Sequence, residues 1–287
     1  MKVTIKAPAK INLYLDVVSK RQDGYHDIKS IMHTVSLSDI VTVEKTKEDA
    51  IILSSNFPHV PTDEKNIAYK AAKKFFEAVE IKEGAKIHIE KHIPVSSGLA
   101  GGSTDAAATL KALNELYNYP LTTEELLSLG ATLGADIPFC ILGGCAACTG
   151  LGEIMIPMPT VEAKHVLVVR GGEGVSTPKA YGMIDTLYGD DVNRDHGDYE
   201  AALDAVNTND IGKLYSSAYN IFEEVILPIH STAQKQKELL LENGAEFCMM
   251  SGSGPAVFAF FKDHITATTA ASAIRKFGAR AFICETI

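Results

Sequence analysis

Residues 94–107 have the sequence PVSSGLAGGSTDAA, a glycine-rich stretch that is the most informative part of the chain. Gly98, Gly101 and Gly102 permit backbone conformations and close approaches that a side chain would block. The apolar spacing that follows predicts a helix from about Ser103, whose free N–H groups and positive dipole end would attract an anion such as phosphate. The stretch is neither a Walker A loop, since no Gly-Lys-Ser/Thr follows, nor a G-x-G-x-x-G motif. Alone it predicts either an anion site or a structural helix cap.

Hydroxyl side chains surround these glycines, at Ser96, Ser97, Ser103 and Thr104. They can donate hydrogen bonds to a phosphate, and Ser103 or Thr104 can reach a phosphate-bound Mg²⁺. Asp105 has a local explanation, because the helix dipole favours an acid in the first turn.

The charge balance restricts the partners. The chain has 287 residues, with 27 Lys and Arg against 36 Asp and Glu, which gives a net charge of −9. An acidic chain is poorly suited to a nucleic-acid backbone or an anionic membrane, so neither is expected as a partner. Backbone amides can still hold a small phosphorylated ligand. Nothing in the sequence indicates a protein partner.

Two charge-free stretches, 137–152 and 247–261, are broken by Gly and Pro. Both fall short of the ~20 apolar residues of a membrane helix. Residues 1–17, MKVTIKAPAKINLYLDV, lack the uninterrupted apolar core of a signal peptide. We therefore expect a soluble, cytoplasmic protein.

Strand and helix patterns alternate through the first half of the chain. Alternating apolar residues over 11–17 predict a half-buried strand, and Asp23-Gly24 predicts a hairpin turn. A helical apolar stripe over 67–79 follows Asn66. A further helix is predicted from Thr122, which forms a capping box with Glu125, to Gly134.

The second half predicts a strand at 165–170, a helix ending at Asn243-Gly244, and two apolar strands around SGSGP at 251–255. A helix to Gly278 and a strand at 280–287 complete it. The Pro-rich stretch IPMPT at 156–160 is the expected boundary. We therefore predict two α+β domains, residues 1–160 and 161–287.

Three of the five cysteines form a C-x4-C-x2-C run, at Cys140, Cys145 and Cys148. This is the opening spacing of one class of iron–sulfur site. The run lies in an apolar segment beside a Gly-Gly pair, so we favour small residues packed in a core over a cluster.

Four segments together resemble the GHMP kinases: PAKINLYLDV (8–17), PVSSGLAGGSTDAA, LGADIPF (133–139) and SGSGPAVF (251–258). The segment KRQDGYHDIKS (20–30) is similar to the branch that acts on a cytidine diphosphate-linked methylerythritol. The resemblance implies an N-terminal domain like the second domain of ribosomal protein S5 and a ferredoxin-like C-terminal domain. It also implies transfer of the ATP γ-phosphoryl group, with Mg²⁺, to the 2-hydroxyl of that substrate.

The resemblance assigns the catalytic roles to Asp136 and Lys10. Asp136 would take the proton of the substrate hydroxyl, and Lys10 would lie beside it and offset charge on the transferring group. If the family resemblance is disregarded, Asp136 is expected only to start a helix before Pro138. Lys10 is then expected to be a solvated lysine on an edge strand.

Binding residues follow from the same resemblance. ATP would be held by the loop residues Pro94, Val95, Ser96, Ser97, Gly98, Leu99, Ala100, Gly101, Gly102, Ser103 and Thr104. Asn66 would contact adenine or act only as a helix N-cap. The small-molecule substrate would be bound by Asn12, Tyr25, His26, Thr177 and Tyr181, with Tyr25, His26 and Tyr181 around the cytosine. Ser251, Gly252 and Ser253 would lie near the phosphates or only form a tight turn.

Two alternatives to this function remain. Ser97 is also found in the loop of homoserine kinases, so a homoserine or mevalonate kinase is the nearer alternative. A non-catalytic ligand sensor on the same scaffold is the other, although both Lys10 and Asp136 are present.

Overall fold

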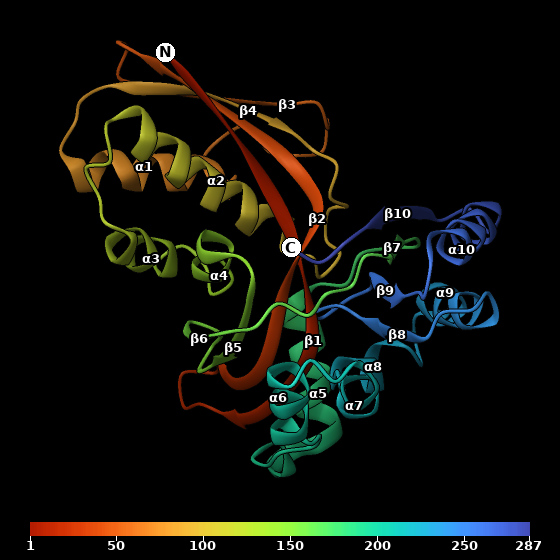
Figure 1. Ribbon diagram of the computed structural model, residues 1–287. Helices are drawn as coiled ribbons and strands as arrows, with labels where there is room; N and C mark the ends of the chain where they lie inside the picture. Colours follow the sequence, from red (N-terminus) through yellow and green to blue (C-terminus); the bar gives the residue numbers. More distant parts are fainter. The chain divides into compact units, whose positions relative to one another are not determined.

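The computed structural model describes residues 1–287, apart from the side chains of Asp190 and Asp191. The chain forms two compact units (Figure 1). Unit 1 comprises residues 1–9, 38–93 and 100–143, and unit 2 comprises 10–37, 94–99 and 144–287. Both are discontinuous because the long strands β1 (Lys2–Lys20) and β2 (His26–Thr46) run through both units. The boundary at residue 160 stays a prediction.

Unit 1 is a sheet covered by helices. The end of β2 pairs antiparallel with β4 (Gly84–Glu90), and β4 pairs parallel with β3 (Ile51–Ser55). The helices are α1 (Ile67–Val79), α2 (Gly101–Leu116), α3 (Thr123–Ala131) and α4 (Ile137–Leu142). One apolar core joins this sheet to α1 and α2, which lie along it in Figure 1.

Local signals set most helix ends in unit 1. Asn66 caps α1 through its side chain, and Thr122 and Glu125 form the expected capping box of α3. One limit in the sequence prediction was wrong, because α3 ends at Ala131 rather than Gly134. The helix α2 begins at Gly101, near the predicted start at Ser103. The backbone turns into α2 at Ala100, which adopts a left-handed conformation that has no clear sequence signal.

Unit 2 contains a four-stranded antiparallel sheet in the order β10-β7-β9-β8. Its strands are β7 (Val166–Arg170), β8 (Phe247–Met250), β9 (Val257–Phe260) and β10 (Arg280–Cys284). With α9 (Ser231–Glu242) and α10 (His264–Lys276) packed on it, this order is that of a ferredoxin-like fold. The predicted strands are present and α9 ends at the predicted Asn243-Gly244, but β7 begins at Val166, α10 ends at Lys276 rather than Gly278, and β10 stops at Cys284.

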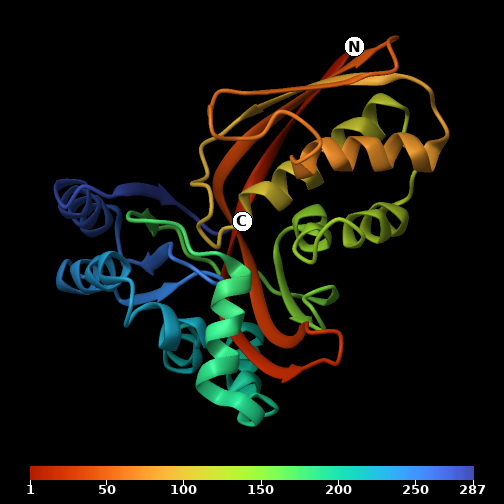
Figure 2. The same ribbon diagram turned by 180° about the vertical axis from the view of Figure 1, so that it is seen from behind.

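The hairpin of β1 and β2 forms a second core of unit 2. It turns at Asp23-Gly24, as predicted, and its apolar side chains pack on α5 (Thr177–Tyr188) and α8 (Phe222–Ile226); Figure 2 shows α5, in green, beside the hairpin. The strands β5 (Cys145–Thr149) and β6 (Ile154–Met158) extend from β2. Short helices η1 (Gly189–Val192), α6 (Tyr199–Asn207) and α7 (Ile211–Ser217) complete the unit.

The expectation of a half-buried strand over residues 11–17 was wrong. Residues 9–17 of β1 are buried on both faces, so the polar side chains Lys10, Asn12 and Asp16 are enclosed. Buried polar groups need partners, and those of β1 become the centre of the candidate site.

The cysteine run packs as core, as the sequence predicts. Cys140 lies on α4, and Cys145 and Cys148 lie on β5; all three side chains are buried. Burial raises the pKa of the Cys145 thiol to about 12. Among the described residues there is no group of three His, Cys, Asp or Glu side chains that could hold a metal ion. Nor is any helix there long and apolar enough to cross a bilayer.

Candidate active site

Lys10 and Asn12 form the buried polar centre of unit 2. Lys10 is 5% exposed, and its ammonium donates to Asn12 Oδ1 at 2.7 Å. Asn12 Nδ2 donates to Ser30 Oγ at 2.9 Å, and Ser30 Oγ donates to the Tyr14 carbonyl at 2.7 Å. An ammonium group has three N–H donors, so Lys10 is held in one direction and keeps donors for a ligand.

The SGSGP turn contacts three of the residues assigned from the sequence. Gly252 N donates to Asn12 Oδ1 at 3.0 Å. Ser251 Oγ donates to the Gly98 carbonyl at 3.1 Å, and the hydroxyls of Ser253 and Thr177 are 3.0 Å apart. The turn is therefore more than a link between β8 and β9, because it fixes the glycine loop and the Lys10 centre within unit 2. Its sequence signal was a run of Gly and Ser, which fits any tight turn equally well.

The first part of the glycine loop, residues 94–99, is folded by its own polar groups. Ser97 is buried and donates from Oγ to the Pro94 carbonyl at 2.7 Å, while its own carbonyl accepts from Ala256 N. Leu99 is fully buried, and its carbonyl accepts from Lys10 N at 3.2 Å. Gly98 has a φ of +82°, which an L-residue rarely adopts. Val95 and Ser96 are exposed.

The second part of the loop enters α2 without a side-chain cap. Ala100 at the N-cap has no side-chain acceptor, so the N-cap residue leaves the first-turn N–H groups of α2 available. Thr104 Oγ1 donates to the Pro8 carbonyl at 2.8 Å, whereas Ser103 is half-buried. A helix start of this kind suits an anion.

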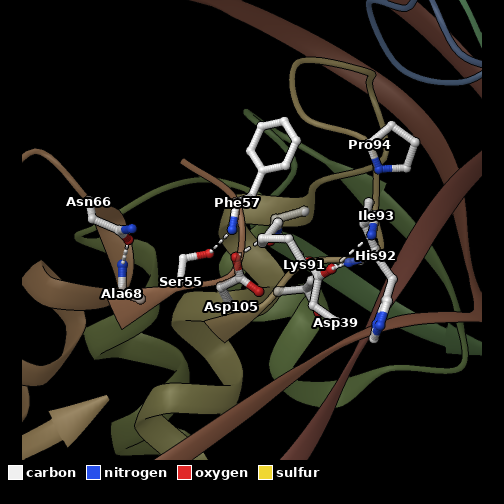
Figure 3. A network of polar contacts seen from close by, with 12 residues as sticks. Asp39, Ser55, Phe57, Asn66, Ala68, Lys91, His92, Ile93, Pro94 and Asp105 are labelled. Carbon is white, nitrogen blue, oxygen red and sulfur yellow. Dashed lines mark hydrogen bonds and ion pairs between the residues drawn. The ribbon is translucent and has the colours of Figure 1, made fainter. Parts of the chain in front are cut away.

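A buried ion network that has no local signal in the sequence lies next to the first turn of α2 (Figure 3). The Lys91 ammonium lies between Asp39 and Asp105, with 2.8 Å to Asp105 Oδ2, and donates to the Gly101 carbonyl at 3.3 Å. Burial raises the pKa of Asp105 to about 8; Asp39 adds to the rise and Lys91 opposes it. The network ties β4 to the first residue of α2.

Asp136 stands at the start of α4 in unit 1. Its carbonyl accepts from Cys140 N, but its half-buried side chain makes no capping hydrogen bond. The carboxylate is therefore not used to hold its own helix, which weakens the purely structural explanation. Lys10 belongs to unit 2, so the pairing of Lys10 with Asp136 stays a prediction.

The residues expected to bind a base gather at the hairpin of unit 2. His26 is buried and its ring stacks on Tyr181, with centroids 4.9 Å apart at 27°. His26 Nε2 lies 2.7 Å from Asp185 Oδ1, and the Lys20 ammonium lies 2.6 Å from Asp185 Oδ2. Tyr25 is 63% exposed beside them. Asp185 carried no signal in the sequence that would link it to His26.

Asn66 is confirmed as a helix N-cap. Its Oδ1 accepts from Ala68 N at 2.9 Å, which Figure 3 shows, and its Nδ2 donates to the Pro61 carbonyl at 2.7 Å. Both amide atoms thus have protein partners, and the adenine contact stays a prediction.

Comparison with known proteins matches two family models, the GHMP kinases N terminal domain over residues 66–144 and the GHMP kinases C terminal over 201–280. A 4-diphosphocytidyl-2-C-methyl-D-erythritol kinase of Clostridium perfringens is 44% identical, covering 93% of this chain and 91% of the relative. The crystal structure of a 4-(cytidine 5'-diphospho)-2C-methyl-D-erythritol kinase matches with a TM-score of 0.83 at 31% identity over 99% of both chains. A homoserine kinase from Cytophaga hutchinsonii matches with a TM-score of 0.76 at 18% identity, over 100% of this chain and 94% of that one, and shares the fold alone.

Proposed function

The chain belongs to the GHMP kinases, within the family of 4-diphosphocytidyl-2-C-methyl-D-erythritol kinases, and on this premise we propose that it phosphorylates the compound for which that family is named. The γ-phosphoryl group of ATP is transferred to the 2-hydroxyl group, a step of the non-mevalonate route to isoprenoid precursors. The buried Lys10 centre carries the proposal, because it presents a fixed ammonium beside the glycine loop and the turn at 251–253.

Asp136 is the proposed base. Phosphoryl transfer depends on position and charge, and the protein's part is to orient the hydroxyl and accept its proton as the oxygen bonds to phosphorus. A carboxylate spared from capping its helix can accept that proton. Lys10 would stabilise the negative charge that develops on the transferred group, since Asn12 holds its ammonium rigidly.

The glycine loop is the proposed phosphate site for ATP. The uncapped N–H groups of α2 point to an anion, and a Cβ on Gly102 would meet only Ile67 Cγ2 at 3.5 Å, so the glycine is not required by packing there. Mg²⁺ would arrive with the ATP phosphates. Ser103, which is half-buried, fits as its protein ligand better than Thr104, which is buried with its hydroxyl fixed on the Pro8 carbonyl.

The cluster of His26, Tyr181 and exposed Tyr25 favours a substrate with a base over homoserine or mevalonate. Aromatic faces supply stacking surface and His26 a polar edge, neither of which the smaller substrates need. No specific observation favours the sensor alternative. An odd number of cysteines, five, fits reduced thiols better than a disulfide framework, and we place the reaction in the cytoplasm.

The test is ADP release from Mg·ATP with three acceptors: the cytidine compound, homoserine and mevalonate. We expect turnover with the cytidine compound alone. Turnover with homoserine or mevalonate instead would support the kinase activity but refute the proposal that the cytidine compound is the substrate. If protein shown to be folded by circular dichroism turns over none of the three acceptors, the proposed enzymatic activity is refuted and a non-catalytic ligand sensor is favoured.

A further inference from the structure

The contact between His26 and Asp185 constrains the chemistry of the imidazole ring. A carboxylate accepts hydrogen bonds, so at 2.7 Å from Asp185 Oδ1 the Nε2 atom of His26 must carry the proton. In the neutral ring the other nitrogen, Nδ1, is then an acceptor with a free lone pair. Tyr181 covers one face of the ring and fixes its plane. A ligand can therefore meet the neutral His26 ring only as the donor of a hydrogen bond to Nδ1.

Lys20 sets the charge around this pair. Its ammonium binds the second oxygen of the same carboxylate, Asp185 Oδ2, at 2.6 Å. The hydrogen bonds from Lys20 and His26 hold the pKa of Asp185 below its usual value, against the effect of its burial. An unbalanced carboxylate would favour the positively charged imidazolium, whereas a carboxylate already paired with Lys20 favours it less. Asp185 and Tyr181 face His26 from α5, and Lys20 acts on it through Asp185 from β1.

We propose that Asp185 and Lys20 are positioning residues that hold His26 through Nε2 and keep Nδ1 as an acceptor, so that the site selects a pyrimidine with an amino group. Cytosine carries a donor amino group at the position where uracil carries a carbonyl acceptor. Two facing acceptors leave one group unpaired, so the uridine counterpart is rejected. This inference rests on the proposed function for its substrate, but not for the state of the ring.

The first measurement is the pH titration of His26 by NMR of the ¹⁵N-histidine-labelled protein, assigned with His26→Gln. Asp185→Asn removes the negative partner and is expected to lower the His26 midpoint relative to the wild type. Lys20→Met removes the balancing cation and is expected to raise it. Opposite shifts identify charge coupling, because a purely structural role would not reverse sign between the two variants. Unchanged midpoints, or shifts in one direction, would overturn the proposal.

The second measurement is kcat/KM for the cytidine substrate and its uridine counterpart. We expect Asp185→Asn to reduce the preference for cytidine about tenfold, the effect of one hydrogen bond, mainly through KM. The acid limb of kcat/KM should move to higher pH in Lys20→Met and to lower pH in Asp185→Asn. The substrate's own ionisations are common to all variants and cancel. An unchanged preference in a folded Asp185→Asn enzyme would overturn the selectivity.

Asp195→Asn is the matched control. Asp195 forms an exposed ion pair with Lys29 at 2.8 Å, which also joins the hairpin to the segment after α5 without contacting His26. It should leave the titration and the preference unchanged. If the wild type fails to phosphorylate either nucleotide compound while the midpoints shift oppositely, the proposed function fails and the positioning of His26 stands. If turnover is normal and the midpoints do not move, the positioning fails alone.

Discussion

Replacing Gly98 by alanine is expected to damage the glycine loop through a specific clash. The backbone at Gly98 has a φ of +82°, and a Cβ there would lie 2.0 Å from the Ser251 carbonyl oxygen. Non-bonded heavy atoms do not approach so closely, so one backbone must move. The oxygen is not free to give way, because it also accepts from Gly254 N at 3.0 Å within the turn.

The magnitude has two parts. Placing an L-residue in the left-handed region costs about 1–2 kcal/mol. Forcing a methyl group into a packed contact typically costs about 1–3 kcal/mol more. Gly98→Ala should therefore lower the free energy of unfolding by about 2–5 kcal/mol. It should also raise the KM for ATP, since the shift separates the loop from the Ser251 turn.

Gly144→Ala separates the two parts. Gly144 belongs to the same unit and has a φ of +73°, and a Cβ added there would have no neighbour within 4 Å. It should lose only the conformational part, about 1–2 kcal/mol. The assay is equilibrium urea unfolding followed by circular dichroism, with steady-state kinetics in ATP. Equal losses in the two variants, or a Gly98→Ala protein as stable as the wild type, would refute the steric argument.

Three further changes test the site. The added methyl group of Gly102→Ala would meet no close neighbour, so the melting temperature should stay unchanged or rise. The KM for ATP should rise about tenfold, because the methyl group would block the approach of a phosphate to that backbone. An unchanged KM for ATP would show that the loop is not part of the ATP site. Asp136→Asn should lower kcat by about 10²–10⁴-fold with ATP binding retained, as measured by turnover and nucleotide titration, and near-wild-type turnover would exclude the base role. The Asp105→Asn side chain is uncharged at every pH, like the protonated acid. Burial raises the pKa of Asp105 in the folded protein to about 8, above its value of about 4 in the unfolded chain, so the wild type loses stability as the pH rises from about 4 to about 8. The variant lacks this loss because it does not titrate at this position. Its melting temperature relative to the wild type should rise over that window, and a difference independent of pH would contradict the assigned pKa.

Local sequence signals determined the elements of this protein well. The capping box of Thr122 and Glu125, the Asn66 cap and the turn at Gly24 were all readable in advance. Each depends on atoms within a few residues along the chain, so local stereochemistry decides it. The resemblance of the four segments to a kinase family pointed to the same fold that the matched structures share.

The tertiary structure alone decided which polar groups meet. Lys91 contacts Asp39 and Asp105, which are 52 and 14 residues away, and His26 meets Asp185 across 159 residues. Sheet register and helix packing set such contacts, and no local pattern encodes them. The alternation over residues 11–17 predicted a half-buried strand, and Lys10 without the family resemblance was expected to be solvated, whereas burial of both faces of β1 encloses it. Elements can be read from neighbours in sequence, but the chemistry of a buried side chain depends on neighbours that only folding supplies.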